Sequence, residues 1–178
     1  MNAGIADRSL NLLRVLLRAF DAPTESACHV LHQAQSAGDV AEAFHVLDHL
    51  ANLIGISFVA AQTVLNDGKT RKDLQESELL DGHPWLTQIE FIDAAANFWK
   101  HHAQWTATEW DLIEGSILPQ LPKRASPAGR TAGQLAGLGI KRSDGARNIP
   151  SLAKKLGYIG FGEKWLLDPI TAWYVPTA

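Results

Sequence analysis

The sequence predicts a mostly α-helical protein, a helical bundle of four to five helices with a small basic C-terminal α/β part. Three observations predict this class. Apolar residues recur at helical spacing through most of residues 1–105, and segments rich in Pro, Gly and charge separate the periodic runs. In addition, 46% of the 178 residues are apolar and 20% are charged, a balance that permits a buried core and excludes a disordered chain. We expect the bundle at 1–118, a linker at 119–130 and the basic subdomain at 131–178.

Two short helices are expected at the start of the chain, over residues 7–21 and 24–37. Pro23 separates them, because proline lacks an N–H and ends or kinks a helix. Thr24 would cap the second helix, and Gly38 would end it. The first helix carries its apolar residues on one face: Leu10, Leu13, Leu17 and Phe20.

The third helix, residues 40–66, has the longest periodic pattern in the sequence. Asp39 is its expected N-cap, with Glu42 three residues later as the partner in a capping box. Its second half is apolar on all sides, so we expect it to be the most buried helix. The next segment, 67–82, has eight charges in sixteen residues and is expected to be a long exposed loop.

A fourth helix is expected over residues 84–105, with Pro84 in its first turn. Its apolar face contains the following residues: Trp85, Ile89, Ile92, Ala96, Trp99 and Ala103. Thr108 begins a fifth, short helix, which Pro119 ends.

The segment after Pro119 has a different composition. The linker is rich in Pro, and two short helical patterns follow at 131–139 and 150–157, each ending in Leu-Gly. The final segment favours short extended pieces that could form a hairpin or meander: 158–161, 164–167 and 172–175.

Charge is distributed unevenly along the chain. Residues 1–122 carry 7 Lys and Arg against 16 Asp and Glu (net −9), whereas residues 123–178 carry 9 against 3 (net +6). The basic part could contact nucleic acid, or the two parts could attract each other. The single cysteine, Cys28, excludes an intramolecular disulfide and fits a cytoplasmic protein. No signal peptide is expected, and the uncharged run 50–66 is too short and polar for a membrane span.

The basic C-terminal part offers one candidate nucleic-acid interface. Two short helices followed by a hairpin would outline a winged helix-turn-helix, although the connection over residues 140–148 is longer than the usual turn. The residues that would contact phosphates are Lys141, Arg142, Arg147, Lys154 and Lys155.

The fourth helix carries the densest group of chemically useful side chains. Asp93, Asn97 and His101 are spaced i, i+4, i+8 and therefore form one row on the helix. Lys100 flanks the row, whereas His102 points about 100° away from it. The row offers an acid–base group and a cation, which suit metal-independent phosphodiester cleavage. The simpler interpretation is a polar helix face that is solvated or bonded to a neighbouring helix.

The pattern Asn97-x-x-Lys100-His101 on a late helix of a helical bundle resembles the signature of HEPN domains. The resemblance covers residues 5–105. It implies a bacterial or archaeal protein of a defence or toxin–antitoxin system, a homodimer, and in many members a ribonuclease. The catalytic candidates it implies are Asn97, Lys100, His101 and His102. The family's Arg is absent, since Ala95 and Ala96 precede Asn97.

Other chemistry has less support in the sequence. The pairs His45/His49 and His29/His32 have helical spacing and could hold zinc with a third ligand, but the HExxH motif and cysteine clusters are absent. We therefore expect neither a metal nor a cofactor. The first hypothesis is a bacterial cytoplasmic interaction or regulatory protein, and the alternatives are a metal-independent ribonuclease and a DNA-binding protein. The expected partners are a second copy, another protein, and RNA or DNA, with no membrane.

Overall fold

The computed structural model describes residues 3–68, 77–115, 126–160 and 162–174, and these residues are mostly helical, which confirms the predicted fold class. They form seven α-helices, two 3₁₀ helices and one antiparallel pair of strands. The elements are α1 (Ala3–Ala37), α2 (Val40–Gly68), β1 (Leu79–Leu80), β2 (His83–Thr87), α3 (Gln88–His101), η2 (His102–Gln104), α4 (Ala107–Glu114), α5 (Pro127–Leu135), η3 (Arg142–Asn148), α6 (Ile149–Lys154) and α7 (Lys164–Tyr174).

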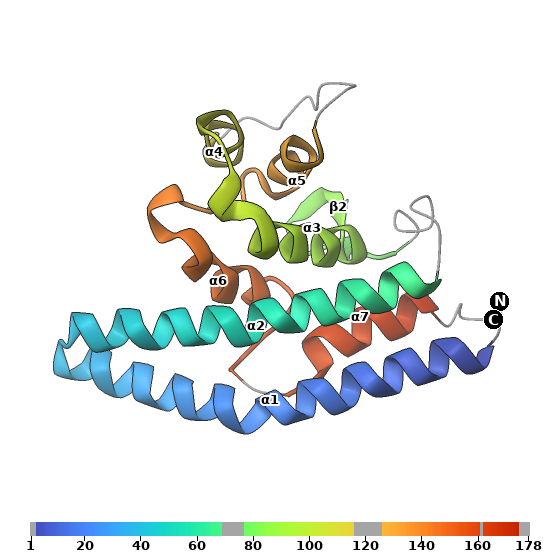
Figure 1. Cartoon of the computed structure of the whole chain (residues 1–178), viewed down its shortest axis with the longest axis horizontal. Coiled ribbons are helices and arrows are strands. Elements are labelled where there is room, and N and C mark those ends of the chain that lie inside the picture. Colours follow the sequence, from blue (N-terminus) through green and yellow to red (C-terminus); the bar gives the residue numbers. More distant parts are fainter. Residues whose placement is uncertain (1–2, 69–76, 116–125, 161, 175–178) are drawn as a thin grey trace.

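Helices α1 and α2 form a long antiparallel hairpin (Figure 1). Gly38 makes the turn with a φ of 72°, a conformation that glycine adopts without strain. The carboxylate of Asp39 then accepts a hydrogen bond from the backbone N–H of Glu42 at 3.0 Å. The predicted helix at 40–66 and its N-cap are therefore confirmed.

The predicted break at Pro23 was wrong, because α1 is one helix of 35 residues with Pro23 inside it. Thr24 does not cap a second helix. Its buried hydroxyl donates instead to the carbonyls of Phe20 at 2.8 Å and Asp21 at 3.0 Å, within the preceding turn. The helix changes direction near its middle (Figure 1), as expected where proline removes a backbone donor. Packing of both halves along α2 outweighs the loss of that hydrogen bond.

The fourth predicted helix begins four residues later than expected. Pro84 lies in β2, which pairs with β1 across a turn in which Gly82 has a φ of 72°. Thr87 caps α3 in a reciprocal capping box with Glu90, and this capping signal sets the start of the helix. Within the predicted loop 67–82, α2 extends to Gly68 and β1 forms, while residues 69–76 lie outside the described part of the chain.

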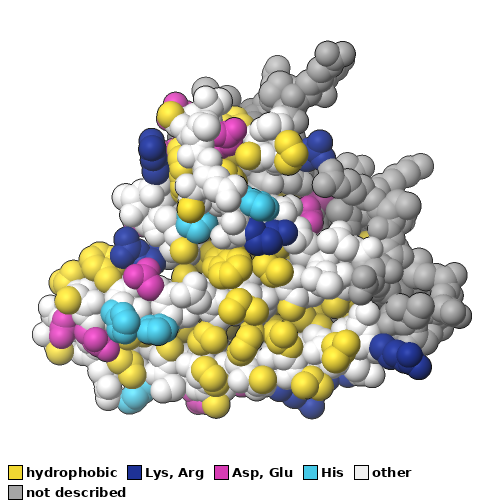
Figure 2. Space-filling model, viewed as in Figure 1, with side chains coloured by type: hydrophobic (Ala, Val, Ile, Leu, Met, Phe, Trp, Pro, Cys, Tyr) yellow, Lys and Arg dark blue, Asp and Glu magenta, His cyan; other side chains and the backbone are white. Residues whose placement is uncertain are grey.

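Helix α3 lies at the centre of the fold, between α2 on one side and α5 on the other (Figure 1). Seven of its 14 residues are buried, so α3 is buried more completely than α2. The expectation that residues 40–66 would be the most buried helix was wrong, because the outer face of α2 is uncovered. Val40 is 63% exposed, and Phe44 is 48% exposed. Figure 2 shows apolar side chains gathered on the surface over α1 and α2.

By length and composition, α2 could cross a membrane, since its segment Val40–Asn66 has a mean hydropathy of 1.4 in its most apolar window. Within this fold, the same helix contacts α1, α3, α6 and α7. Its apolar residues therefore supply much of a globular core.

The C-terminal residues join the core of the bundle. The predicted linker 119–130 contains the start of α5, and residues 116–125 lie outside the described part. The predicted extended pieces at 164–167 and 172–175 were wrong where they are described, because α7 covers residues 164–174. Trp165 of α7 packs edge-to-face on Phe58 of α2, with ring centroids 5.2 Å apart. This packing favours a helix despite the aromatic and β-branched residues of the segment.

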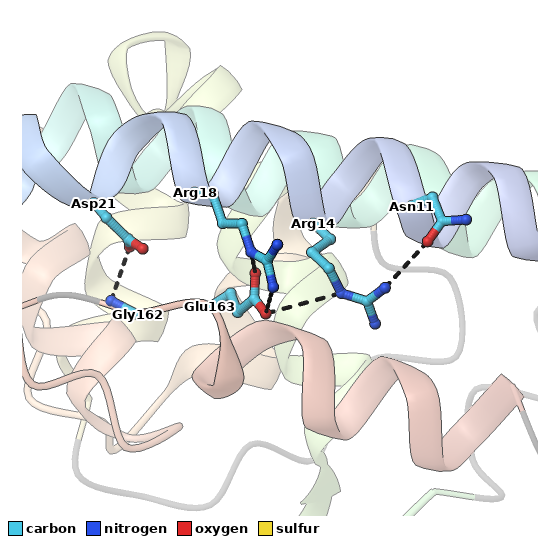
Figure 3. A network of polar contacts seen from close by, with 6 residues as sticks. All are labelled: Asn11, Arg14, Arg18, Asp21, Gly162 and Glu163. Carbon is cyan, nitrogen blue, oxygen red and sulfur yellow. Dashed lines mark hydrogen bonds and ion pairs between the residues drawn. The ribbon is translucent and has the colours of Figure 1, made fainter.

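A network of hydrogen bonds and ion pairs joins the residues just before α7 to α1 (Figure 3). Arg18 donates two hydrogen bonds to the carboxylate of Glu163, at 2.8 and 3.1 Å. Arg14 lies 3.8 Å from the same carboxylate. The backbone N–H of Gly162 donates to Asp21 at 2.8 Å. Three side chains of α1 therefore fix the turn that precedes α7.

The contact between α2 and α3 depends on Gly55. A Cβ atom at this position would lie 2.2 Å from Cδ1 of Trp99, far inside van der Waals contact. Glycine thus lets the indole of Trp99 lie directly against the backbone of α2.

We expect Gly55→Ala to lower the free energy of unfolding by about 1–3 kcal/mol, the usual cost of overpacking, although alanine favours helix by ~1 kcal/mol. Urea denaturation measures the change, and Asn52→Ala on the exposed side of α2 is the control. In a Trp99→Leu background the Gly55→Ala penalty should largely disappear. An equal penalty in both backgrounds would contradict the contact.

Candidate functional site

The polar row of α3 lines a pocket. Asp93, Asn97 and His101 lie along one wall, and residues of α5 form the facing wall. The cavity has a volume of about 580 Å³, within the range of small-molecule sites. We call it the α3–α5 pocket, and its lining consists of Glu90, Asp93, Asn97, His101, Gln104, Trp105, Ser126, Pro127, Ala128, Arg130, Thr131 and Gln134.

A buried amide of α2 holds Asp93 and Asn97 in place on the α3 wall. We call these two side chains the floor of the pocket. The Nε2 group of Gln62 donates to Asp93 Oδ1 at 2.6 Å and to Asn97 Oδ1 at 3.0 Å. Asn97 in turn donates from Nδ2 to Asp93 Oδ2 at 3.3 Å. Because Gln62 is only 6% exposed, these bonds are shielded from water and hold both side chains in one orientation.

Lys100 takes part in this network from outside the pocket. Its ammonium group donates to Oε1 of Gln62 at 2.6 Å, which orients the amide so that Nε2 faces Asp93 and Asn97. Lys100 is not among the residues that line the cavity. Lys100 therefore acts on Asp93 and Asn97 indirectly, by fixing the orientation of the Gln62 amide.

The two adjacent histidines have different surroundings. His101 is exposed and lines the pocket. His102 is half-buried, stacks on Phe98 with ring centroids 5.1 Å apart, and places Nδ1 at 3.1 Å from the carbonyl oxygens of Phe98 and Trp99. The helical spacing predicted this division. His101 is available to a ligand, and His102 belongs to the packing at the end of α3.

Helix α5 contributes the main cation of the pocket, Arg130, which was not among the predicted site residues. Among the described residues, Arg130 forms no ion pair. Ser126 caps α5, with its Oγ accepting from the backbone N–H of Gly129 at 3.0 Å, so the positive end of this helix also borders the cavity. The signal was present in the sequence: Ser126 followed by Pro127 is a typical helix start.

Two carboxylates of the pocket already have donors within the protein. Glu90 accepts from the backbone N–H and the hydroxyl of Thr87, both at 3.2 Å. Asp93 accepts from Gln62 and Asn97. Arg130 is the one Lys or Arg side chain in the lining, and among the described residues it forms no ion pair.

Trp105 closes the end of the pocket with an unused donor. Its side chain is 8% exposed and packs edge-to-face against Phe98 and Trp110, with centroids 5.3 and 5.4 Å away. Its buried indole N–H has no hydrogen-bond partner in the described part of the chain. A buried donor without a partner is costly, so Trp105 carries an unfavourable contribution to stability at this position.

The basic residues of the C-terminal part do not form the predicted winged helix. The segment expected to form the hairpin wing contains helix α7 instead. The two preceding helices pack into the bundle: α5 contacts α3, and α6 contacts α2. Arg147 lies over the ring of Phe44, 4.5 Å from its centroid, and 3.9 Å from Asp48 of α2. The remaining candidates are exposed: Lys141, Arg142, Lys154 and Lys155.

Within the described ranges, three or more His, Cys, Asp or Glu side chains nowhere gather closely enough to hold a metal ion. Comparisons with family models, with curated proteins and with solved structures gave no match. The chemistry that this site can support is therefore inferred from its side chains and their geometry.

Separate substitutions of the two histidines should have different effects on stability. His101→Ala should change the free energy of unfolding by about 0.5 kcal/mol or less, as is usual for an exposed residue. His102→Ala should cost about 1–3 kcal/mol, because the ring loses its stacking on Phe98 and its backbone hydrogen bond. Thermal melts of the two variants test this division, and a larger loss for His101→Ala would reverse the assignment of the two faces.

Proposed function

We propose that this protein is a helical ligand-binding protein of the regulatory type. Its α3–α5 pocket would take a small polar molecule that carries an anionic group and N–H donors. The observation that supports this most is Arg130, a guanidinium without a described counter-ion on the wall that faces His101 and Asn97.

The electrostatics of the two walls favour such a ligand. Arg130 and the N-terminus of α5 attract negative charge, and a guanidinium can bind a carboxylate or phosphate with two parallel hydrogen bonds. On α3, Glu90 and Asp93 have further acceptor capacity for N–H groups of the ligand. One end of the ligand would therefore meet α5 and the other end the floor on α3.

Binding should depend on the guanidinium of Arg130. We expect Arg130→Gln to weaken binding of an anionic ligand by about 10- to 100-fold, the cost of one charged hydrogen-bonding partner. Isothermal titration calorimetry with inorganic phosphate, adenosine 5′-monophosphate and L-glutamate would measure this, with uncharged adenosine as the comparison.

Arg142→Gln is the matched control, since Arg142 is exposed and lies outside the pocket lining. It should leave the affinity unchanged. Equal losses for Arg130→Gln and Arg142→Gln would indicate general attraction by positive charge. The proposal would also fail if none of the anionic compounds bound at millimolar concentration.

A metal-independent ribonuclease is the second candidate, because Arg130 could supply the cation that the HEPN-like pattern lacks. His101 would act as the general acid–base group, and Asn97 would orient it or the substrate. This hypothesis follows the resemblance to bacterial defence and toxin–antitoxin proteins, and a cytoplasmic location is proposed from the single cysteine, Cys28.

In this case, the purified protein should cleave total RNA in the presence of EDTA. His101→Ala should reduce the rate by about 10²- to 10⁴-fold, the typical contribution of a general acid or base, and Arg130→Gln should also reduce it. Gel electrophoresis of the products measures the rate, with Arg8→Gln on the exposed side of α1 as the unaffected control. If the wild type leaves RNA intact, the ribonuclease hypothesis is wrong and the ligand-binding proposal is unaffected.

The homodimer that the resemblance implies stays part of this proposal. Exposed apolar residues on the two long helices support it: Leu12 (71% exposed), Val15 (66%) and Ile56 (39%). A second copy that packed its own α1–α2 hairpin against this face would cover these side chains.

A further inference from the structure

We propose that His45 and His49 form a surface binding site for a divalent transition-metal ion such as Cu²⁺ or Zn²⁺. The two residues lie one turn apart on α2, and both are exposed. Figure 2 shows adjoining histidine side chains at the surface over the first half of this helix. Neither residue lines the α3–α5 pocket, so the site is independent of the function proposed above.

The distance between the two rings fits a shared metal ion. The Nε2 atoms of His45 and His49 are 3.2 Å apart, and the ring planes are nearly perpendicular, at 86°. Two imidazole nitrogens that bind one zinc ion at about 2.05 Å, with a tetrahedral angle of about 109°, lie about 3.3 Å apart. The side chains therefore already have the separation that two ligands of one ion require.

In the free protein, one hydrogen bond joins the two rings. In neutral rings, the N–H of one Nε2 donates a hydrogen bond to the other Nε2, and both rings are exposed to water. A metal ion would use the lone pairs of both nitrogens at once, with the protons on the Nδ1 atoms. Binding thus replaces one hydrogen bond with two coordinate bonds.

Two groups of opposite charge lie near the pair in the fold, Asp48 on α2 and Arg147 on η3. Asp48 lies between the two histidines in sequence, and its carboxylate is 3.9 Å from the guanidinium of Arg147 on η3. Arg147 is held over the ring of Phe44, so its position is fixed by α2 itself. Because the protein supplies two ligands, water would complete the coordination, as in exchangeable sites rather than closed structural ones. The expected order of affinity places Cu²⁺ above Zn²⁺.

The chain contains a matched pair for comparison on α1. His29 and His32 are also exposed but are three residues apart. The Nε2 atom of His29 lies 2.9 Å from Nε2 of Gln33 and is hydrogen-bonded there. His32→Ala is therefore a control that removes an exposed histidine from the other long helix.

The experiment titrates the full chain, without an affinity tag, with ZnCl₂ and with CuCl₂. At a tenfold excess of Zn²⁺ over its dissociation constant, the melting temperature should rise by roughly 3–6 °C. His45→Ala and His49→Ala should each weaken binding by roughly tenfold or more, because one of the two ligands is lost. His32→Ala should bind as the wild type does. With Cu²⁺, electron paramagnetic resonance should show two nitrogen ligands in the wild type and fewer in either single variant.

The site would be refuted by wild-type affinity in His49→Ala, by an equal loss in His32→Ala, or by no thermal shift in the wild type. A Cu²⁺ spectrum with the same number of nitrogen ligands in the wild type and in His45→Ala would also refute it. Substitution of exposed histidines should leave the fold intact, and the melting temperature without metal checks this directly.

Discussion

The crossing of α3 over α2 depends on one buried amide, that of Gln62. This side chain forms hydrogen bonds with Asp93, Asn97 and Lys100 together, and these bonds require the side chains of α3 to face Gln62. A slip of α3 by one residue would leave the amide unpaired in a nearly dry environment, where an unsatisfied polar group is costly. Gly55 favours the same register, because the absence of a side chain there leaves room for the indole of Trp99 against α2.

This constraint also shapes the chemistry of the pocket. Because Gln62 and Asn97 donate to Asp93, the negative charge of the floor is balanced by fixed dipoles and not by Arg130. Arg130 on the facing helix forms no ion pair among the described residues. No ion pair joins the two walls among the described residues, and the carboxylate of Asp93 is hydrogen-bonded to Gln62 of α2 instead.

Features that depend on residues within one helix could be predicted from the sequence. Contacts between segments far apart in the sequence could not. The spacing of Asp93, Asn97 and His101 predicted their common face, and Asp39 predicted the start of α2. Pro23 and Pro84 gave misleading boundaries, because packing along α2 and the cap at Thr87 outweighed the local preference of proline. Arg130 was missed because only the docking of α5 on α3 brings it to the row.

The contact between Arg18 and Glu163 joins residues 145 positions apart, and this separation bears on the order in which the fold assembles. The α1–α2 hairpin forms through a two-residue turn, so its contacts close short loops at its tip and carry little entropic cost. The contact of α7 with α1 closes a loop of most of the chain and therefore costs more conformational entropy than the contacts at the tip of the hairpin. We therefore expect α7 to dock late in folding and to leave first on unfolding, which would expose Phe58 and the middle of α2 before the hairpin itself opens.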